Sequence, residues 1–212
     1  MKAAIYAGTF DPITLGHLDL VERAAKLFDR LVIAVAVHSR KAVLFKVEER
    51  VDMVREVSKK FPNVEVESFD GLLVQYARKR GIHVVVRGIR AFSDFEFEFQ
   101  MALTNRKMAP DIETIFLMPN EDYSYVSSST VREVAQLGGD TGNFVAKPIQ
   151  KALEIKLGKD RSKHDHRSFQ SFPGGGSIRR RGAENHTAIG PKPARQGGKP
   201  CLLRFSRPDR LA

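Results

Sequence analysis

Short apolar runs alternate with segments of helical periodicity over the first 157 residues of the chain. Five runs of strand length, rich in Val, Ile and Ala, predict strands at 3–7, 31–37, 64–67, 83–86 and 114–118. The segments between and after them repeat apolar residues at helical spacing and predict helices at 18–28, 47–60, 72–80, 92–108, 130–137 and 148–157. Because each helical crossover returns the chain to the same end of the sheet, this alternation favours parallel strands. We therefore predict an α/β fold, with a single doubly wound domain around a five-stranded parallel sheet.

One segment carries two conflicting periodicities. Residues 94–99 alternate acidic and aromatic side chains, which by itself favours a strand. Phe95 and Phe99 are also spaced for one face of a helix, and the segment continues past Met101 without a turn signal. Its length decides for a helix, and Phe97 then lies off the apolar stripe. We expect Phe97 to be an exposed aromatic residue that can serve a subunit contact.

Polar motifs follow each predicted strand at its carboxyl end. They lie at 8–17, 39–41, 69–71, 87–90 and 120–129. In a doubly wound sheet these strand ends meet along one edge, where ligands bind. The sequence therefore predicts a Rossmann-like domain whose binding site is built from loops far apart in the chain.

The segment from Gly8 to His17 combines a strand end, a turn and a helix start. Gly8 and Gly16 carry no Cβ, so the backbone can approach a ligand closely there. The helix offers unpaired N–H groups and the positive end of its dipole to an anion, with the hydroxyls of Thr9 and Thr14 nearby. An imidazole at the helix start can donate a hydrogen bond to a phosphate oxygen that gains negative charge. The segment is a candidate phosphate site, although the same residues are compatible with an ordinary turn that carries a surface histidine.

Charge and composition divide the chain near residue 158. The net charge is +10, but residues 158–212 hold 13 of the 35 Lys and Arg and only 4 of the 25 Asp and Glu. The same segment has 8 of the 16 Gly and 5 of the 10 Pro, with no sustained apolar periodicity. Such a composition cannot bury enough apolar surface to offset the entropy of ordering the chain. We expect a folded domain at 1–157 and a basic, Gly/Pro/Arg-rich disordered tail at 158–212.

The basic tail raises the question of a nucleic-acid partner. Arg179, Arg180 and Arg181 could contact RNA, DNA or an anionic surface. Only Phe205 lies close among the arginines as an aromatic stacking platform would. We therefore favour a solvated tail and do not expect nucleic acid as a partner.

Cysteine content and hydropathy bear on the compartment. The single cysteine, Cys201, lies in the tail, so neither an intramolecular disulfide nor a Cys-based metal cage is expected. No apolar run approaches the ~20 residues that a membrane span needs, and the apolar stretch at the start is too short for a signal peptide. These features predict a cytoplasmic protein without a membrane partner.

Three blocks in register carry a resemblance to a known family. They are Tyr-Ala-Gly-Thr-Phe-Asp-Pro-Ile-Thr-Leu-Gly-His-Leu-Asp at 6–19, Arg-Gly-Ile-Arg-Ala-Phe-Ser-Asp-Phe-Glu-Phe-Glu at 87–98 and Tyr-Ser-Tyr-Val-Ser-Ser-Ser-Thr-Val-Arg-Glu at 123–133. Over residues 1–157 the chain resembles the bacterial phosphopantetheine adenylyltransferases of the nucleotidyltransferase superfamily. The first block alone indicates the superfamily, and the other two in register narrow it to this family.

The resemblance implies an adenylyltransferase of coenzyme A biosynthesis. The family reversibly transfers the adenylyl group of ATP to 4′-phosphopantetheine, which gives dephospho-coenzyme A and pyrophosphate. It works without a covalent enzyme intermediate, by positioning and charge stabilisation with Mg²⁺, a strategy suited to phosphoryl chemistry. The resemblance further implies a homohexamer, and we expect no metal site built from protein side chains.

Family roles carry over onto the matching positions of this chain. The resemblance implies catalytic roles for His17, Lys41 and Arg90. It implies ATP contacts from Thr9, Phe10, His17, Gly88, Ile89, Arg90, Glu98, Tyr123, Ser124, Tyr125, Val126, Ser127, Ser128 and Ser129. It implies phosphopantetheine contacts from Thr9, Lys41, Leu73 and Arg87.

Other interpretations stay open from the sequence alone. A nicotinate or nicotinamide mononucleotide adenylyltransferase, or a cytidylyltransferase, could share the first block. The chain could instead be a non-catalytic nucleotide-sensing or RNA-binding module that acts through its basic tail. Arg87 and Arg90 could instead pair with Asp94 and Glu96 in a surface network. Thr130 and Glu133 have the spacing of a capping box, which would explain part of the hydroxyl content there.

Overall fold

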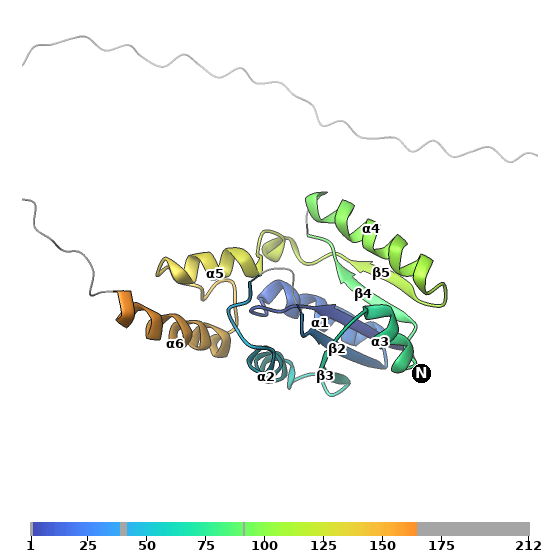
Figure 1. Ribbon diagram of the computed structural model, residues 1–212, viewed down its shortest axis with the longest axis horizontal. Helices are drawn as coiled ribbons and strands as arrows, with labels where there is room; N and C mark the ends of the chain where they lie inside the picture. Colours follow the sequence, from blue (N-terminus) through green and yellow to red (C-terminus); the bar gives the residue numbers. More distant parts are fainter. Residues whose placement is uncertain (1, 39–41, 91, 165–212) are drawn as a thin grey trace, which may run out of the picture. The chain divides into compact units, whose positions relative to one another are not determined.

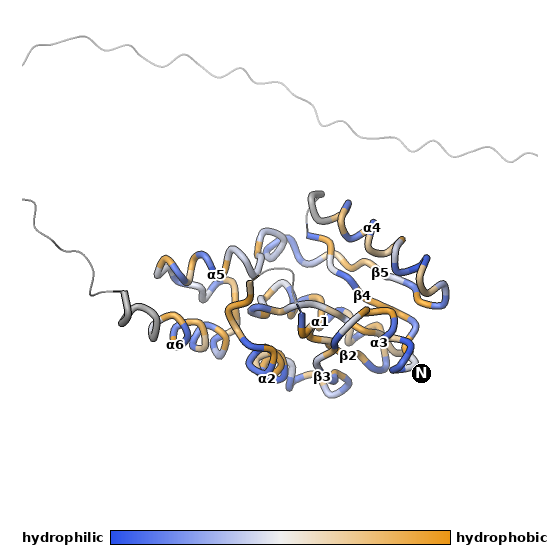
Figure 2. The backbone as a smooth tube through the Cα atoms, in the orientation of Figure 1, coloured by the Kyte–Doolittle hydropathy of each residue, from blue (hydrophilic) through white to orange (hydrophobic). Residues whose placement is uncertain are grey.

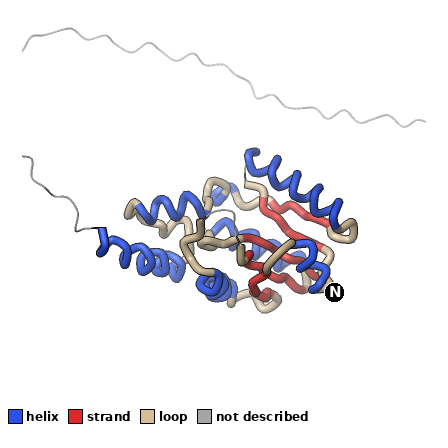
Figure 3. Tube along the Cα trace, viewed as in Figure 1, coloured by secondary structure: helices blue, strands red, loops and turns tan. Residues whose placement is uncertain are grey.

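The computed structural model describes residues 2–38, 42–90 and 92–164 of the chain. In chain order its elements are β1 (Ala3–Gly8), α1 (Leu15–Leu27), β2 (Arg30–Ala36), α2 (Val47–Ser58), β3 (Val64–Phe69), α3 (Leu73–Lys79), β4 (Val84–Gly88), α4 (Phe92–Met108), β5 (Glu113–Leu117), a short 3-10 turn η1 (Glu121–Tyr123), α5 (Ser128–Gln136) and α6 (Lys147–His164). Figures 1 and 3 show this alternation of strands and helices. The order that the apolar pattern predicts is confirmed.

The strands of the described part form one parallel sheet in the order β3-β2-β1-β4-β5. The pairing of β1 with β2 runs from Ala3 opposite Arg30 to Gly8 opposite Val35. On its other side β1 pairs with β4, so the chain moves outward in opposite directions from these two central strands. The predicted doubly wound, Rossmann-like fold is therefore confirmed, and its topological switch point lies between β1 and β4.

Side chains that alternate along the strands build a hydrophobic core on each face of the sheet. Ala4 and Tyr6 of β1 pack on one face with residues of α1, α2, α5 and α6. Ile5 and Ala7 pack on the other face with residues of α3 and of the segment that follows α4. Each Val or Ile that becomes fully buried in this way contributes roughly 1.5–3 kcal/mol to folding. The helices therefore cover both faces, and the carboxyl ends of the strands are left for the loops.

Two helices begin earlier than their apolar periodicity predicts. Helix α1 starts at Leu15, where the hydroxyl of Thr14 accepts a hydrogen bond from the backbone N–H of His17 (3.4 Å). Helix α5 starts at Ser128, and the hydroxyl of Ser127 accepts from the N–H of Thr130 (3.0 Å). The cap of α5 is therefore Ser127 and not Thr130. The difference arises because neither Gly16 and His17 in the first turn of α1 nor the hydroxyl residues in that of α5 extend the apolar pattern, whereas a capping side chain fixes the start of a helix.

Helix α4 confirms the helical prediction for 92–108 but not the burial of its stripe. Phe95 and Phe99 are each 45% exposed, with their rings stacked 5.6 Å apart. Phe97 is 54% exposed, as expected for a residue off the stripe. Figure 2 shows apolar residues distributed along this helix. The expectation that this stripe forms a core face of the domain is wrong. Apolar residues lie around much of α4, and only some of them can face the sheet.

Helix α6 extends further along the chain than its apolar spacing predicts. Helix α6 runs to His164, past the residue 157 at which its apolar spacing ends. The rest of the expected tail, residues 165–212, lies outside the described residues, and so does Lys41. No helix of the described part is both long and apolar enough to cross a bilayer.

Candidate active site

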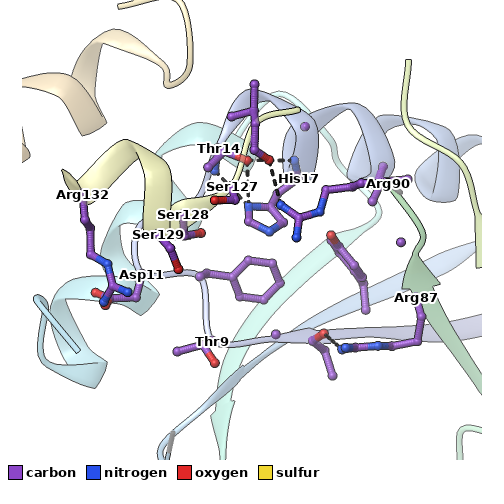
Figure 4. Close-up of a pocket in the computed structure, with 18 of the residues that line it drawn as sticks. Thr9, Asp11, Thr14, His17, Arg87, Arg90, Ser127, Ser128, Ser129 and Arg132 are labelled. Carbon is purple, nitrogen blue, oxygen red and sulfur yellow. Dashed lines mark hydrogen bonds and ion pairs between the residues drawn. The ribbon is translucent and has the colours of Figure 1, made fainter. Parts of the chain in front are cut away.

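A cavity of about 280 Å³ opens at the switch point of the sheet, above the ends of β1 and β4. Its walls come from the segment after β1, the end of β4, helix α4 and the start of α5 (Figure 4). Among the predicted site residues it is lined by Thr9, Phe10, His17, Arg87, Gly88, Arg90, Glu98, Val126, Ser127, Ser128 and Ser129. Segments far apart in sequence thus converge at the place where doubly wound sheets bind ligands.

The end of β1 is shaped by the close packing of Phe10. Phe10 has a positive φ of 50° and is 3% exposed. Its ring packs edge-on against Tyr6 and His17, at centroid distances of 5.4 and 5.3 Å. A Cβ on Gly8 would lie 2.9 Å from this ring, so no larger residue fits without displacing it. Because its side chain is committed to packing, Phe10 can offer a phosphate only its backbone.

His17 is held as a neutral hydrogen-bond donor. Its Nδ1 accepts the backbone N–H of Thr14 (3.0 Å) and lies 3.0 Å from the Thr14 hydroxyl. A ring nitrogen that accepts from a backbone N–H carries no proton, so the neutral ring has its hydrogen on Nε2. Burial lowers the pKa of His17 to about 3, and the positive charges of Arg90 and Arg87 act in the same direction. The imidazole therefore presents Nε2–H to the cavity and stays neutral near pH 7.

Two guanidinium groups lie at the end of β4. Arg87 donates to both carboxylate oxygens of Glu98, through Nε (2.7 Å) and Nη2 (2.6 Å), and through Nη1 to the carbonyl of Ala7 (2.5 Å). Arg90 donates through Nη1 to the carbonyl of Val126 (2.9 Å), which ties β4 to the segment before α5. The partner of Arg87 is therefore Glu98 on the cavity wall. Both cations are held in place before any ligand binds.

The serines before and in the first turn of α5 have distinct structural roles. The Ser127 hydroxyl caps the helix, and that of Ser128 donates to the carbonyl of Pro12 (2.8 Å). Ser129 lines the cavity beside them. The first turn of any α-helix has N–H groups without intrahelical acceptors, which suits an anion. The capping residues of α5 therefore also border a candidate anion site. Figure 4 shows Ser127, Ser128 and Ser129 together at the start of this helix.

Several predicted site residues lie away from the cavity lining. Leu73 begins α3 and packs against the core cluster of the opposite sheet face. Ile89 uses its backbone N–H to bond the carbonyl of Leu117 (3.1 Å). Tyr123 and Ser124 lie in and after the 3-10 turn, and Tyr125 is 68% exposed. The cavity does not bring these residues together with the others, and Lys41 lies outside the described residues.

The cavity also contains residues to which the sequence analysis gave no role. Its remaining lining includes Tyr6, Asp11, Leu20 and Arg132. Asp11 is 3% exposed and pairs with Arg132 of α5 (2.6 Å). A signal for Arg132 is present in the sequence, because it follows Ser129 by three residues and so lies on the same side of the helix. Asp11 lies within the phosphate motif, but a single acidic residue there gives no hint of its partner.

The described residues contain no group of three or more His, Cys, Asp or Glu side chains placed to hold a metal ion. The two cavity carboxylates, Asp11 and Glu98, are both engaged by arginines. Mg²⁺ often enters nucleotide sites on the phosphates of its substrate, with few protein ligands.

Comparisons with known proteins agree with this geometry. Residues 5–134 match the family model described as cytidylyltransferase-like. The chain is 54% identical over 158 residues to the phosphopantetheine adenylyltransferase of Desulforudis audaxviator. This match covers 74% of this chain and 97% of that protein. It is 52% identical over 160 residues to the phosphopantetheine adenylyltransferase of Carboxydothermus hydrogenoformans, with 76% and 99% covered.

Solved structures share the architecture at much lower identity. Nicotinic acid mononucleotide adenylyltransferase of Plasmodium falciparum superposes with a TM-score of 0.54 and 14% identity, over 73% of this chain and 95% of that one. At such identity the likeness speaks to the fold alone. The two chains therefore share a fold.

Proposed function

The chain belongs to the phosphopantetheine adenylyltransferase family of cytidylyltransferase-like nucleotidyltransferases, and from this premise we propose that it transfers the adenylyl group of ATP to 4′-phosphopantetheine. The products are dephospho-coenzyme A and pyrophosphate, and the reaction is reversible. The observation that carries the proposal is identity above 50% to relatives of that name over nearly their whole length. The cavity at the switch point supplies a site of suitable chemistry.

The reaction is a displacement at phosphorus. An oxygen of the acceptor phosphate attacks the α-phosphorus of ATP and forms a new P–O bond. The bond from the α-phosphorus to the oxygen bridging the β-phosphate breaks, and pyrophosphate leaves with that electron pair. The acceptor is already an anion, so the attack needs no general base. Catalysis then rests on alignment and on stabilisation of the negative charge.

His17 is the central donor in this proposal. Its Nε2–H donates to a non-bridging oxygen of the α-phosphate, where negative charge grows as the phosphorus becomes five-coordinate. A histidine with a pKa of about 3 is neutral near pH 7, so it acts by hydrogen bonding and does not transfer a proton. Arg90 and Lys41 add positive charge at the reacting phosphates. The N–H groups at the start of α5 receive phosphate oxygens of the nucleotide.

The remaining family roles complete the proposal. Thr9 contacts both substrates, Arg87 and Leu73 contact phosphopantetheine, and Glu98 with residues 123–129 contacts ATP. Mg²⁺ supplies charge neutralisation when it arrives on the phosphates of ATP. The proposed assembly is a homohexamer, and the exposed aromatic residues of α4 support a subunit contact within it. The proposed compartment is the cytoplasm.

The test is a pyrophosphate-release assay with a panel of acceptors. The full chain is incubated with ATP and Mg²⁺, and with phosphopantetheine, nicotinate mononucleotide or nicotinamide mononucleotide in turn. A parallel series pairs CTP with cytidylyltransferase acceptors such as glycerol 3-phosphate. We expect turnover with ATP and phosphopantetheine. Turnover with another acceptor and none with phosphopantetheine would replace the proposal by one of the rival nucleotidyltransferase activities.

A further inference from the structure

Arg50 of α2 is a charged residue that is only 1% exposed. Among the described residues, every hydrogen bond of its guanidinium goes to a backbone carbonyl group. Nη1 donates to the carbonyls of Thr9 (2.7 Å) and Ala36 (2.8 Å). Nε donates to that of Phe45 (3.1 Å), and Nη2 more weakly to that of Val37 (3.4 Å). One side chain thus joins the loop after β1, the end of β2 and the segment before α2.

The carboxylate of Asp11 completes this connection. Its oxygens accept the backbone N–H groups of Leu44 (2.8 Å) and Phe45 (2.9 Å). Phe45 is therefore fixed at its N–H by the carboxylate and at its carbonyl by the guanidinium. The preceding residues, Ala42 and Val43, line the cavity. The guanidinium and the carboxylate together brace two walls of the cavity against each other.

A buried guanidinium is an unfavourable way to stabilise a fold if stability is its only role. Burial lowers the pKa of Arg50, although the charges of Asp11 and Glu48 oppose the shift. No carboxylate of the described residues makes a recorded hydrogen bond with the guanidinium. Burying a cation in this way is costly, and apolar packing would often serve folding as well. A guanidinium is distinct in offering five N–H donors in one rigid plane, which suits several carbonyls at fixed positions.

We propose that Arg50 is a positioning residue of the active site, whose buried guanidinium fixes the loop that carries Thr9 against the wall formed by residues 42–45. Arg50 is not among the residues that line the cavity, so it acts through the backbone it holds. As a result, the two walls keep a fixed position relative to each other across the space where the phosphates react. The kinetic part of the inference rests on the proposed function, because the rate of adenylyl transfer is the quantity that reports how the two walls are aligned.

The test uses graded substitutions of Arg50 in the full chain. Arg50→Lys keeps the charge but offers three donors from a single atom, whereas Arg50→Met keeps the length of the side chain and removes every donor. Arg55→Met is the matched control, because Arg55 lies on the same helix and its side chain is 56% exposed. Melting curves first establish a temperature at which each variant is folded. The kcat and KM for both substrates are then measured per folded molecule.

We expect kcat/KM to fall about fivefold in Arg50→Lys and on the order of 100-fold in Arg50→Met, because small misplacements of reacting groups have effects of this size. Arg55→Met should match the wild type. A folded Arg50→Lys protein with wild-type kinetic constants would overturn the inference, even if Arg50→Met failed to fold. Lower melting temperatures with unchanged kcat and KM would overturn it as well, since they would indicate a purely structural residue.

A second measurement separates this inference from the choice of acceptor. Inorganic pyrophosphate is titrated calorimetrically into the wild type and the three variants. We expect binding about tenfold weaker in Arg50→Met than in Arg55→Met, a loss of about 1.4 kcal/mol. If the wild type binds pyrophosphate but does not turn over phosphopantetheine, the proposed function fails while the inference is still decided by this titration. Equal pyrophosphate affinity in folded Arg50→Met and in the control would contradict it.

Discussion

At the scale of single residues, the protonation state of His17 is set by its surroundings. Nδ1 is occupied by Thr14, and burial beside two arginines keeps the ring neutral. This arrangement separates the residue from the acid–base histidines of many enzymes, whose pKa values lie near the working pH. It also links an active-site group to the pH dependence of folding, because the unfolded chain has no such surroundings.

The first prediction concerns pH. The pKa of His17 is 6.5 as a free group and about 3 in the folded protein, so between these values the unfolded state binds a proton that the native state does not. The stability that the wild type has above pH 6.5 is therefore lost as the pH falls, by up to about 1.4 kcal/mol per pH unit relative to His17→Gln. Urea unfolding at about pH 7 and about pH 4.5 measures the difference.

The matched control for this experiment is His83→Gln, because the His83 side chain is 60% exposed. Because this variant keeps His17, it should retain the loss of stability that His17 causes as the pH falls. The rate of the wild-type enzyme should show no titration of His17 between about pH 5 and about pH 8. Parallel stability curves for wild type and His17→Gln would contradict the neutral, buried histidine.

At the scale of secondary-structure elements, helix α4 both lines the cavity and exposes aromatic side chains. It contributes Glu98 to the cavity wall, and it exposes Phe95 and Phe99 on one side and Phe97 off that stripe. Exposed apolar side chains gathered on one element of a folded domain commonly mark an interaction surface. The helix therefore connects the proposed subunit contact directly to the site.

The second prediction concerns this exposed face. We expect Phe97→Glu to reduce the size of the assembly, because a charge would be buried without a partner in an apolar contact. Leu137→Glu is the control, since Leu137 is 81% exposed at the end of α5. Light scattering after gel filtration measures the mass of each variant. An assembly of unchanged mass in Phe97→Glu would contradict a contact through this part of α4.

At the scale of the whole molecule, the chain divides into a folded unit that contains the cavity and a basic extension beyond it. The cavity is lined by residues between Tyr6 and Arg132, all within residues 5–134, which match the family model. The relatives are covered almost completely by 74–76% of this chain. The proposed chemistry therefore needs no residue of the extension.

The third prediction follows from this division. A chain that ends after His164, the last residue of α6, should keep the kcat and the KM values of the full chain within about twofold, because the cavity and its core remain intact. Its net charge should fall, and with it any retention on heparin or nucleic acid. Loss of adenylyl transfer on truncation would instead favour a module that works through its basic tail.

The sequence by itself determined the order of elements and the edge of the sheet where the site lies. Period-two and helical patterns depend on which face of each element is buried, and helical crossovers return the chain to the same end of the sheet, which favours parallel strands. The motif from Gly8 to His17 and the serines at 127–129 could be found in the same way, because glycine and capping residues have local effects. The resemblance to phosphopantetheine adenylyltransferases added the specific reaction and its substrates.

Only the tertiary structure decided which side chains meet. Arg50 reaches the carbonyl of Thr9 across 41 positions of sequence, and Arg132 reaches Asp11 across 121. Helical spacing from Ser129 points to Arg132 itself but not to its partner, and Arg50 has no such signal, since each contact depends on how closely separate loops approach once the sheet is formed. The same holds for the exposed stripe of α4, whose burial depends on what packs against it. Local patterns fix elements, whereas long-range packing fixes the partners, the protonation of His17 and the shape of the cavity.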